Sequence, residues 1–228
     1  MSVTSHDVAE KPILFSGPMV RAILTGQKTQ TRRILKDPDG FATDAESFVD
    51  QDGWWHPCAD LVARGIQDPI GPRIRCPYGQ PGDRLWLRET WTPVDCLATG
   101  YDLDEPMSIG YAADRAAIRW GHEDCQVLDT YAWNWEDLKW KPSIFMPRWA
   151  SRITLEIGGV RVERLQDISE EDAKAEGVPD QGIGNMRVFT QMGANRYHFA
   201  TLWDQINGKR ADWMSNPWVW VVSFKRVQ

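Results

Sequence analysis

The chain has 228 residues, and its 26 lysines and arginines against 32 aspartates and glutamates give a formal net charge of −6. A general duplex-DNA binder has to neutralise many phosphates, so strong duplex DNA binding is not expected. A small ligand, or a short single strand held by a local basic patch, stays open as a partner. The 42% hydrophobic and 25% charged residues are ordinary for a globular protein with a buried core.

Neither a membrane nor a metal is expected. No apolar run approaches the roughly 20 residues that span a bilayer, and residues 1–10 lack the apolar middle of a signal peptide. We therefore expect a disordered tail over 1–10 and a cytoplasmic protein. The cysteines form no C-x-x-C pair, and His56, Cys58 and Cys76 fit no common zinc spacing, so we expect reduced thiols and no metal or other cofactor.

The first predicted elements are a strand, a helix and a second strand. Residues 12–15 (PILF) form a short apolar strand. Pro18 suits the first turn of a helix, Gly26 suits its end, and the apolar face between them consists of Met19, Val20, Ile23 and Leu24. The second half of residues 27–34 is then predicted to be a strand.

Two long segments interrupt this pattern. Residues 36–80 carry Asp, Gly and Pro clusters and are predicted to be an irregular insertion, and residues 92–148 form a second one. Between them, the turn Pro81-Gly82-Asp83 leads into a strand over 84–91. One face of that strand carries Leu85, Leu87 and Glu89, and the other carries Trp86, Arg88 and Thr90.

The last third of the chain alternates strands and helices. Apolar residues alternate over 153–162 across Gly158-Gly159, which predicts two strands or one bent strand. A helix over 169–177 begins at the N-cap Ser169 and ends at Gly177. A second helix over about 195–206 has a stripe expected in the core (Phe199, Leu202, Trp203 and Ile206), and a strand over 218–227 follows.

These elements predict an α+β protein built as a small mixed β-barrel with flanking helices. Strands before and after each insertion are needed to close the sheet. We therefore predict a single domain over 11–228, with the insertions at about 36–80 and 92–148 attached to it.

The segment "GQKTQTRR", Gly26 to Arg33, gathers one lysine and two arginines in an acidic chain. It resembles the signature of the ASCH domain, Gly-x-Lys-x-x-Glu-x-Arg, at Gly26, Lys28 and Arg33, with Thr31 where glutamate is common. ASCH domains are β-barrels related to the PUA RNA-binding domain. The resemblance therefore implies a PUA-like fold and a nucleoside or single-stranded RNA as partner.

With threonine at position 31, the segment is similar to that of the small bacterial ASCH enzymes that hydrolyse N4-acetylcytidine, whose sequence at this place is "GRKTITIR". Their proposed catalytic set is a lysine, this threonine and a glutamate on a later helix. The resemblance implies those roles for Lys28, Thr31 and Glu176, the last from "ISEEDAKAEGV" against "LTEKHAEQENM". The segment "PGDRLWL" also resembles the family's "TGDVLRV". Because both insertions are additional, the whole chain resembles the larger ASCH proteins of bacteria and their prophages.

The chemical properties of these residues also permit this reaction, without reference to the family. Threonine is a weak nucleophile that needs an adjacent base, and a lysine whose pKa is lowered by burial or by neighbouring cations is one. Neutral Lys28 would then take the Thr31 proton, which requires a turn or bulge between them. Glu176 would protonate the leaving amine or activate water. Tryptophans would wall the pocket, with four candidates: Trp86, Trp135, Trp140 and Trp218.

Further substrate-binding candidates are Arg32, Arg33, Arg88, Glu89 and Trp86. Each also has a structural interpretation. Basic strand residues often form a solvated face, and Arg88 with Glu89 is expected as a structural ion pair. A glutamate at a helix C-terminus, such as Glu176, is electrostatically disfavoured and is tolerated at a surface.

Three functions stay open at this stage. The first is an amidohydrolase that cleaves the amide of N4-acetylcytidine or a related acylated nucleoside. The second is a non-catalytic RNA or modified-nucleotide binding module that uses arginines for phosphate and tryptophans for bases. The third is a metal-independent ribonuclease. The oligomeric state does not follow from the sequence.

Overall fold

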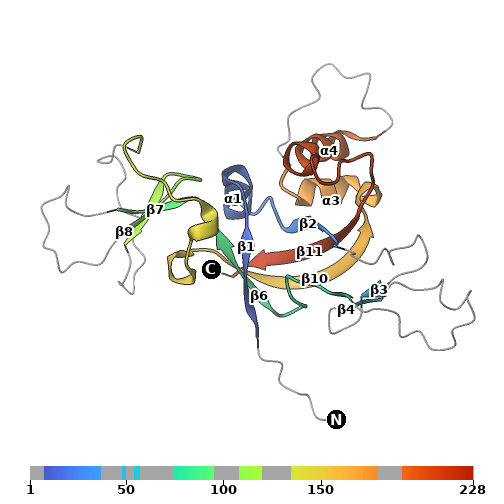
Figure 1. Cartoon of the computed structure of the whole chain (residues 1–228), viewed down its shortest axis with the longest axis horizontal. Coiled ribbons are helices and arrows are strands. Elements are labelled where there is room, and N and C mark those ends of the chain that lie inside the picture. The colour runs from blue at the N-terminus through green and yellow to red at the C-terminus, as the bar shows by residue number, and fades with distance from the viewer. Residues whose placement is uncertain are drawn as a thin grey trace, which may run out of the picture.

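The structure is a computed structural model that describes residues 8–36, 48–49, 54–56, 74–94, 108–119, 135–178 and 192–227. A curved five-stranded sheet forms its centre, and helices stand on it (Figure 1). The sheet contains β1 (Glu10–Leu14), β2 (Gln30–Ile34), β6 (Arg84–Arg88), β10 (Thr154–Arg164) and β11 (Trp218–Arg226), in the spatial order β1-β6-β10-β11-β2. β1 pairs with β6 in parallel, and the other pairings are antiparallel.

The α+β class is confirmed, but the expected closed barrel is wrong. In the part of the chain that the structure describes, β1 and β2 are the two edges of the sheet, and no sheet closes on itself. The two edges are connected by a side chain in place of a strand ladder, because Arg33 of β2 donates from Nη2 to the Leu14 carbonyl of β1 at 2.6 Å. The five-stranded sheet is therefore open between β1 and β2.

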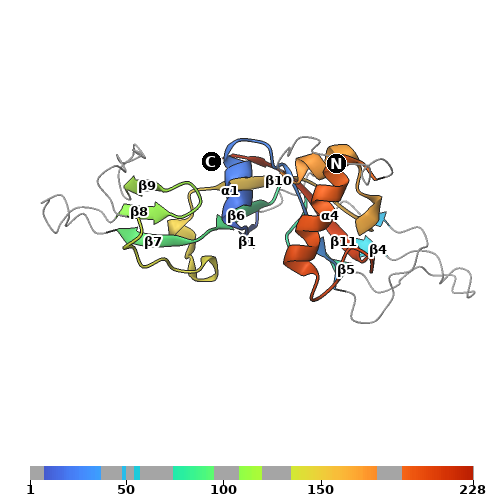
Figure 2. The ribbon, with the colours of Figure 1, turned by 90° about the horizontal axis from the view of Figure 1, so that it is seen from above.

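Two apolar clusters cover the sheet. Side chains of β11 alternate between them with the period of two that a strand imposes, so Trp220 and Val222 enter one cluster and Val219 and Val221 enter the other. The first cluster includes α1 (Gly17–Leu24), and the second includes α4 (Ala194–Asn207) and α3 (Glu170–Ala175). Seen from above, α1 and α4 stand apart on the sheet (Figure 2).

Most predicted element boundaries are confirmed. α1 ends before Gly26, which has a φ of 75°, and the Ser169 hydroxyl caps α3 by accepting from the Asp172 N–H at 3.0 Å. β10 is one bent strand with a register shift between Ile157 and Gly159. The segment over 84–91 is broken, because β6 ends at Arg88 and β7 begins at Trp91.

Both insertions contain regular structure that sequence patterns did not predict. The first holds a small antiparallel sheet of β3 (Phe48–Val49), β4 (Trp54–His56) and β5 (Ile74–Arg75). The second holds a sheet of β7 (Trp91–Val94), β8 (Ser108–Tyr111) and β9 (Ala116–Arg119), followed by 3-10 turns at Ser143–Phe145 and Arg148–Ala150. A third such turn, Leu165–Asp167, precedes α3.

One prediction falls mostly on residues outside the described ranges. The predicted tail over 1–10 lies outside the described residues up to residue 7, and β1 begins at Glu10. Among the described helices, none combines the length and the apolar composition that crossing a membrane requires.

Gly177, just after α3, is packed closely against the segment before β2. It has a φ of 77°, and an added Cβ would lie 2.8 Å from the Lys28 Cβ and 2.9 Å from the Ala22 Cβ. We expect Gly177→Ala to lower the free energy of unfolding by about 2 to 5 kcal/mol, from left-handed strain plus overpacking. Urea denaturation measures this loss.

Gly26→Ala is the matched control, because Gly26 has a φ of 75° and nothing within 4 Å of its added Cβ. It should cost about 1 to 2 kcal/mol, from backbone strain alone. Equal losses for the two variants would contradict the close fit at Gly177.

Candidate functional site

Lys28 connects the end of α1 to the end of α3. Its backbone N–H donates to the Ala22 carbonyl at 2.9 Å, and Lys28 forms an isolated β-bridge with Glu176. Lys28 as a residue is 2% exposed. Its ammonium donates to the Gln30 carbonyl at 2.8 Å, the Glu176 carbonyl at 2.8 Å and Glu176 Oε2 at 2.7 Å. An ammonium has three donors, so these acceptors use all of them.

Glu176 is the C-cap residue of α3, and its carboxylate is held by two cations. Oε2 pairs with Lys28, and Oε1 accepts from Arg32 Nη1 at 3.1 Å; the residue is 4% exposed. A carboxylate at a helix C-terminus is repelled by the helix dipole. The two cations offset this repulsion, which explains why Glu176 is buried and not at the surface.

Arg32 is saturated by carboxylates. Beyond Glu176, its Nη2 lies 2.5 Å from Glu163 Oε1 and 2.8 Å from Asp172 Oδ2, and its Nη1 donates to Gln30 Oε1 at 2.7 Å. Burial alone would lower the pKa of the Arg32 guanidinium, but the surrounding carboxylates outweigh burial and raise it. Arg32 is therefore a fixed structural cation that orients Glu176.

Thr31 and Glu176 both line one cavity at the open edge of the sheet. The cavity has a volume of about 340 Å³. Its walls come from the β1–α1 junction, β2, the end of α3, one 3-10 turn and α4 (Leu14, Phe15, Ser16, Met19, Thr31, Arg32, Arg33, Ser143, Glu176, Phe199, Leu202, Trp203, Ile206 and Asn207). The structure thus brings two of the three predicted catalytic residues to the same space.

The main chain of β2 also faces this space. Thr29 O accepts from Phe224 N, and Leu35 N donates to Trp218 O, so the odd-numbered residues of β2 direct their main-chain groups toward β11. In an antiparallel strand the alternate residues direct theirs away. The Arg32 N–H therefore points to the free edge, next to the Thr31 side chain, and within the described residues it has no hydrogen-bond acceptor.

Lys28 lies behind Glu176 and is not a wall residue of the cavity. Burial lowers the pKa of its ammonium, while Glu176 acts in the opposite direction. No hydrogen bond joins Lys28 to Thr31 in the described part of the chain. The expected direct proton transfer from Thr31 to Lys28 thus has no support in the geometry, and Glu176 is the titratable group that both binds Lys28 and lines the cavity with Thr31.

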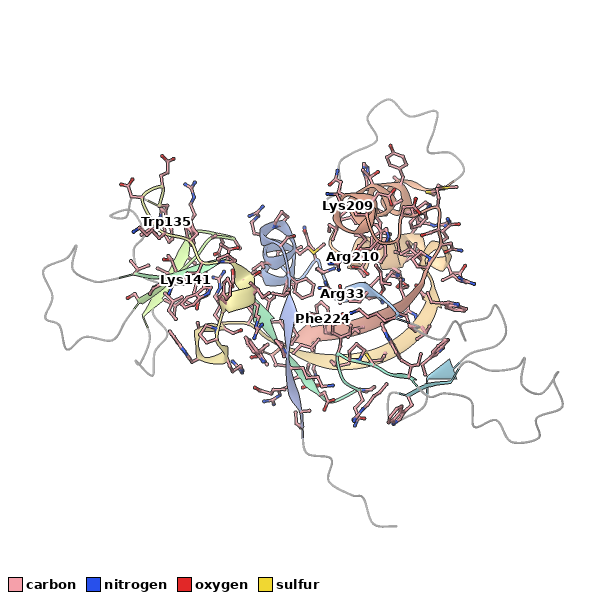
Figure 3. All side chains as sticks on the ribbon, viewed as in Figure 1. Arg33, Trp135, Lys141, Lys209, Arg210 and Phe224 are labelled. Carbon is pink, nitrogen blue, oxygen red and sulfur yellow. The ribbon has the colours of Figure 1, made fainter. Side chains whose placement is uncertain are left out.

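Arg33 is the remaining basic wall residue. Its guanidinium lies 5.2 Å from the Phe15 ring centroid, and one of its donors binds the Leu14 carbonyl. Burial lowers the pKa of this guanidinium. Figure 3 labels Arg33 close to Phe224 of β11, and the pairing of Arg33 with Trp220 puts it on the face of the sheet that packs against α1.

The candidates on and after β6 lie elsewhere. Arg88 covers the Trp86 ring at 4.6 Å and donates to the Ile144 carbonyl at 3.3 Å, and neither residue is a wall residue of the cavity. The expected Arg88–Glu89 ion pair is wrong, because Glu89 is 1% exposed and binds Arg152 at 2.9 Å.

Arg152 explains that difference. It also pairs with Asp114 at 2.8 Å, so it joins the central sheet to the β8–β9 turn. Burial raises the pKa of Glu89, against the opposing effect of Arg152. The arrangement gives Glu89 and Arg152 a structural role.

Sequence reasoning missed the wall that α4 supplies. Leu202 and Ile206 were placed in the core with Phe199 and Trp203, but Ile206 is 54% exposed and both residues line the cavity. Of the tryptophans, Trp203 lines it, whereas Trp135 stacks on Trp140 at 5.9 Å beside the second sheet. Helical spacing identifies the apolar stripe of α4, but whether each of its residues is buried depends on which other element packs against that residue.

No group of three or more His, Cys, Asp and Glu side chains that could hold a metal occurs in the described ranges. Of the residues considered for such a site, Cys76 is a buried free cysteine, whereas Cys58 lies outside those ranges.

The comparisons with known proteins are negative. No protein-family model, no curated protein and no solved structure matches this chain. The function therefore has to be argued from the residues and their geometry.

The pKa of Lys28 predicts a pH dependence of stability. Because its pKa in the folded protein is lowered, the unfolded chain binds the proton more tightly between that value and the ordinary value of about 10.4. The unfolding free energy should therefore rise with pH in that interval, by at most about 1.4 kcal/mol per pH unit. Lys28→Met should lack this rise.

Urea denaturation of both proteins between pH 7 and pH 10.5 measures the difference, in which the titration of other lysines and tyrosines cancels. A wild-type advantage that instead declines with rising pH would mean that the ion pair with Glu176 dominates over burial.

Proposed function

We propose that this chain is an ASCH-type, PUA-like protein that binds a nucleoside base in the cavity and hydrolyses an exocyclic amide such as that of N4-acetylcytidine. One observation carries the proposal. Thr31 and Glu176, far apart in sequence, line one sheltered cavity, and Lys28 binds Glu176 directly behind it. These are the three positions that match the catalytic set of the similar small enzymes.

The first half-reaction forms an acyl ester on Thr31. Its hydroxyl oxygen attacks the amide carbon and gives its proton to Glu176. The adjacent Arg32 N–H, directed to the free edge, donates to the oxyanion as the carbonyl becomes tetrahedral. The C–N bond then breaks, and the exocyclic nitrogen of the base takes the proton from Glu176, so that cytidine leaves as a neutral amine.

The second half-reaction regenerates the site. A water molecule attacks the ester, Glu176 accepts its proton, and the carboxylic acid leaves as Thr31 recovers its hydroxyl proton. Lys28 and Arg32 hold the Glu176 carboxylate in one orientation through both steps. Lys28 is a positioning residue in this account, since all three of its donors are used and it does not line the cavity.

The cavity walls support a planar aromatic ligand. Half of the wall residues are large and apolar (Leu14, Phe15, Met19, Phe199, Leu202, Trp203 and Ile206). Ligand sites commonly enclose about 300 to 1,000 Å³ with apolar walls and a few placed polar groups, and the volume of about 340 Å³ is at the small end of that range. A single nucleoside is of suitable size.

The second candidate function is binding without turnover. The saturated contacts of Lys28 and Arg32 favour it, because a rigid network of satisfied ion pairs also serves a purely structural purpose. A non-catalytic reader of RNA or of a modified nucleotide would use the same walls and leave Thr31 chemically silent.

Cytidine release separates the two functions. Wild type incubated with N4-acetylcytidine should release cytidine, measured by chromatography. Glu176→Gln should lower kcat by about 100- to 10,000-fold, as expected for a lost general acid–base group. Thr31→Val keeps the shape of the residue and removes the nucleophile, so it should lower kcat at least as far.

Thr29→Val is the matched control. Thr29 is exposed, precedes β2 and does not line the cavity, so its variant should retain wild-type release. The folded state of each variant is checked by circular dichroism and urea denaturation. Hydrolysis by Thr31→Val at the wild-type rate would contradict the nucleophile, and an inert wild type that still binds cytidine would favour the binding module.

A further inference from the structure

Arg33 is a cavity-lining cation with donors left over. A guanidinium has five N–H donors, and one hydrogen bond of Arg33 appears within the described residues, from Nη2 to the Leu14 carbonyl. Its Nε is buried and has no hydrogen-bond partner. Arg32, one residue earlier, is held by three carboxylates and has a structural role. Arg33, in contrast, keeps donors for a ligand.

The formal charges around the cavity also distinguish Arg33 from Arg32. The ion-pair network beside the cavity joins three cations to three carboxylates, so its formal charge is zero: Lys28, Arg32 and Arg161 against Glu163, Asp172 and Glu176. Arg33 forms no ion pair with any described residue, and the carboxylate of Glu176, which acts on the pKa of Arg33 through its charge, is already bound by Lys28 and Arg32. Counted over the residues that the structure describes, the cavity therefore carries one positive charge in excess.

We infer that Arg33 binds the phosphate of the ligand, so that the preferred ligand of the cavity is a mononucleotide and not a neutral nucleoside. This inference rests on the proposed function for the base and adds the charged part of the ligand. A guanidinium fork matches a phosphate in a bidentate arrangement, and such charge-assisted hydrogen bonds are strong where water is excluded. Burying an unpaired cation is costly, and an anionic ligand removes that cost.

The surroundings of Arg33 agree with an anion at this end. Asn207 is a wall residue at the end of α4, and the exposed Lys209 and Arg210 follow it. In the view of Figure 3 both cations appear above Arg33, at the end of α4, which packs on the face of the sheet opposite to the one that carries Arg33. Two carboxylates also lie in this region, Asp204 and Asp212, and their charges balance those of Lys209 and Arg210, so the excess positive charge rests on Arg33.

The inference is tested by calorimetric titration with cytidine and with cytidine 5′-monophosphate, the product pair, which avoids turnover. Wild type should bind the monophosphate at least about tenfold more tightly than cytidine, and added salt should narrow the ratio. Arg33→Gln should lose the preference for the monophosphate, so that its affinities for cytidine and for the monophosphate become about equal. Arg21→Gln, at an exposed arginine of α1 outside the wall, should retain it.

The outcomes separate this inference from the proposed function. Equal affinity of wild type for cytidine and its monophosphate overturns the role of Arg33 while leaving nucleoside binding intact. An unchanged preference in Arg33→Gln overturns it as well. A short cytidine-containing RNA that binds wild type more than tenfold more tightly than the monophosphate overturns the mononucleotide assignment. If wild type binds neither cytidine nor the monophosphate, the proposed function itself fails.

Turnover supplies a second readout if Arg33→Gln is poorly folded. With wild type, N4-acetylcytidine 5′-monophosphate should have a KM at least about tenfold below that of N4-acetylcytidine at a similar kcat, because phosphate binding is remote from the reacting carbonyl. A lower kcat for the monophosphate at an equal KM would contradict the inference.

Discussion

The buried ion pair between Lys28 and Glu176 is the constraint on which the site depends. It joins the residue before β2 to the last turn of α3, two segments separated by 148 positions in the chain. The pair lies at the edge of β2 that faces away from β11, where Lys28 also binds the Gln30 carbonyl, and it holds Glu176 at the cavity wall. The main-chain bond from Thr29 N to Ala175 O, at 2.9 Å, strengthens the same connection.

Such a pair is expensive, since two charges removed from water must be compensated by good geometry and further hydrogen bonds. This site has both. Every ammonium donor of Lys28 has an acceptor, and both oxygens of Glu176 accept from cations. This carboxylate lines the cavity with Thr31, whose hydroxyl has no hydrogen-bond partner among the described residues, and that is the arrangement which the proposed acid–base chemistry would use.

How much the sequence predicts depends on whether the signal is local. Caps, turns and periodicity are local, so α1, α3 and β11 are predicted within a few residues, and the cap at Ser169 is correct. The partners of charged residues are not local. Arg88 and Glu89 are adjacent in sequence, but they lie on opposite faces of the chain, and Glu89 finds Arg152 instead. The same reasoning predicts Ile206 in the core, because its spacing matches Phe199 and Trp203, although Ile206 is 54% exposed on α4.

The barrel was wrong for a related reason. Strand order follows from pairings between distant segments, and the edge strands β1 and β2 meet through the Arg33 side chain and leave the cavity between them. The convergence of Lys28 and Glu176, in contrast, was anticipated by motif resemblance and not by periodicity. Motifs record which distant residues work together, and spacing does not carry that information.

Carbon-13 NMR of the Glu176 side chain tests the central claim most directly. In protein labelled at glutamate carboxyl carbons, the Glu176 resonance, assigned with Glu176→Gln, should shift when cytidine 5′-monophosphate is added, together with the Thr31 methyl signal. The account predicts both shifts with one shared dissociation constant. Ligand binding that perturbs other residues and leaves both of these signals in place would contradict it.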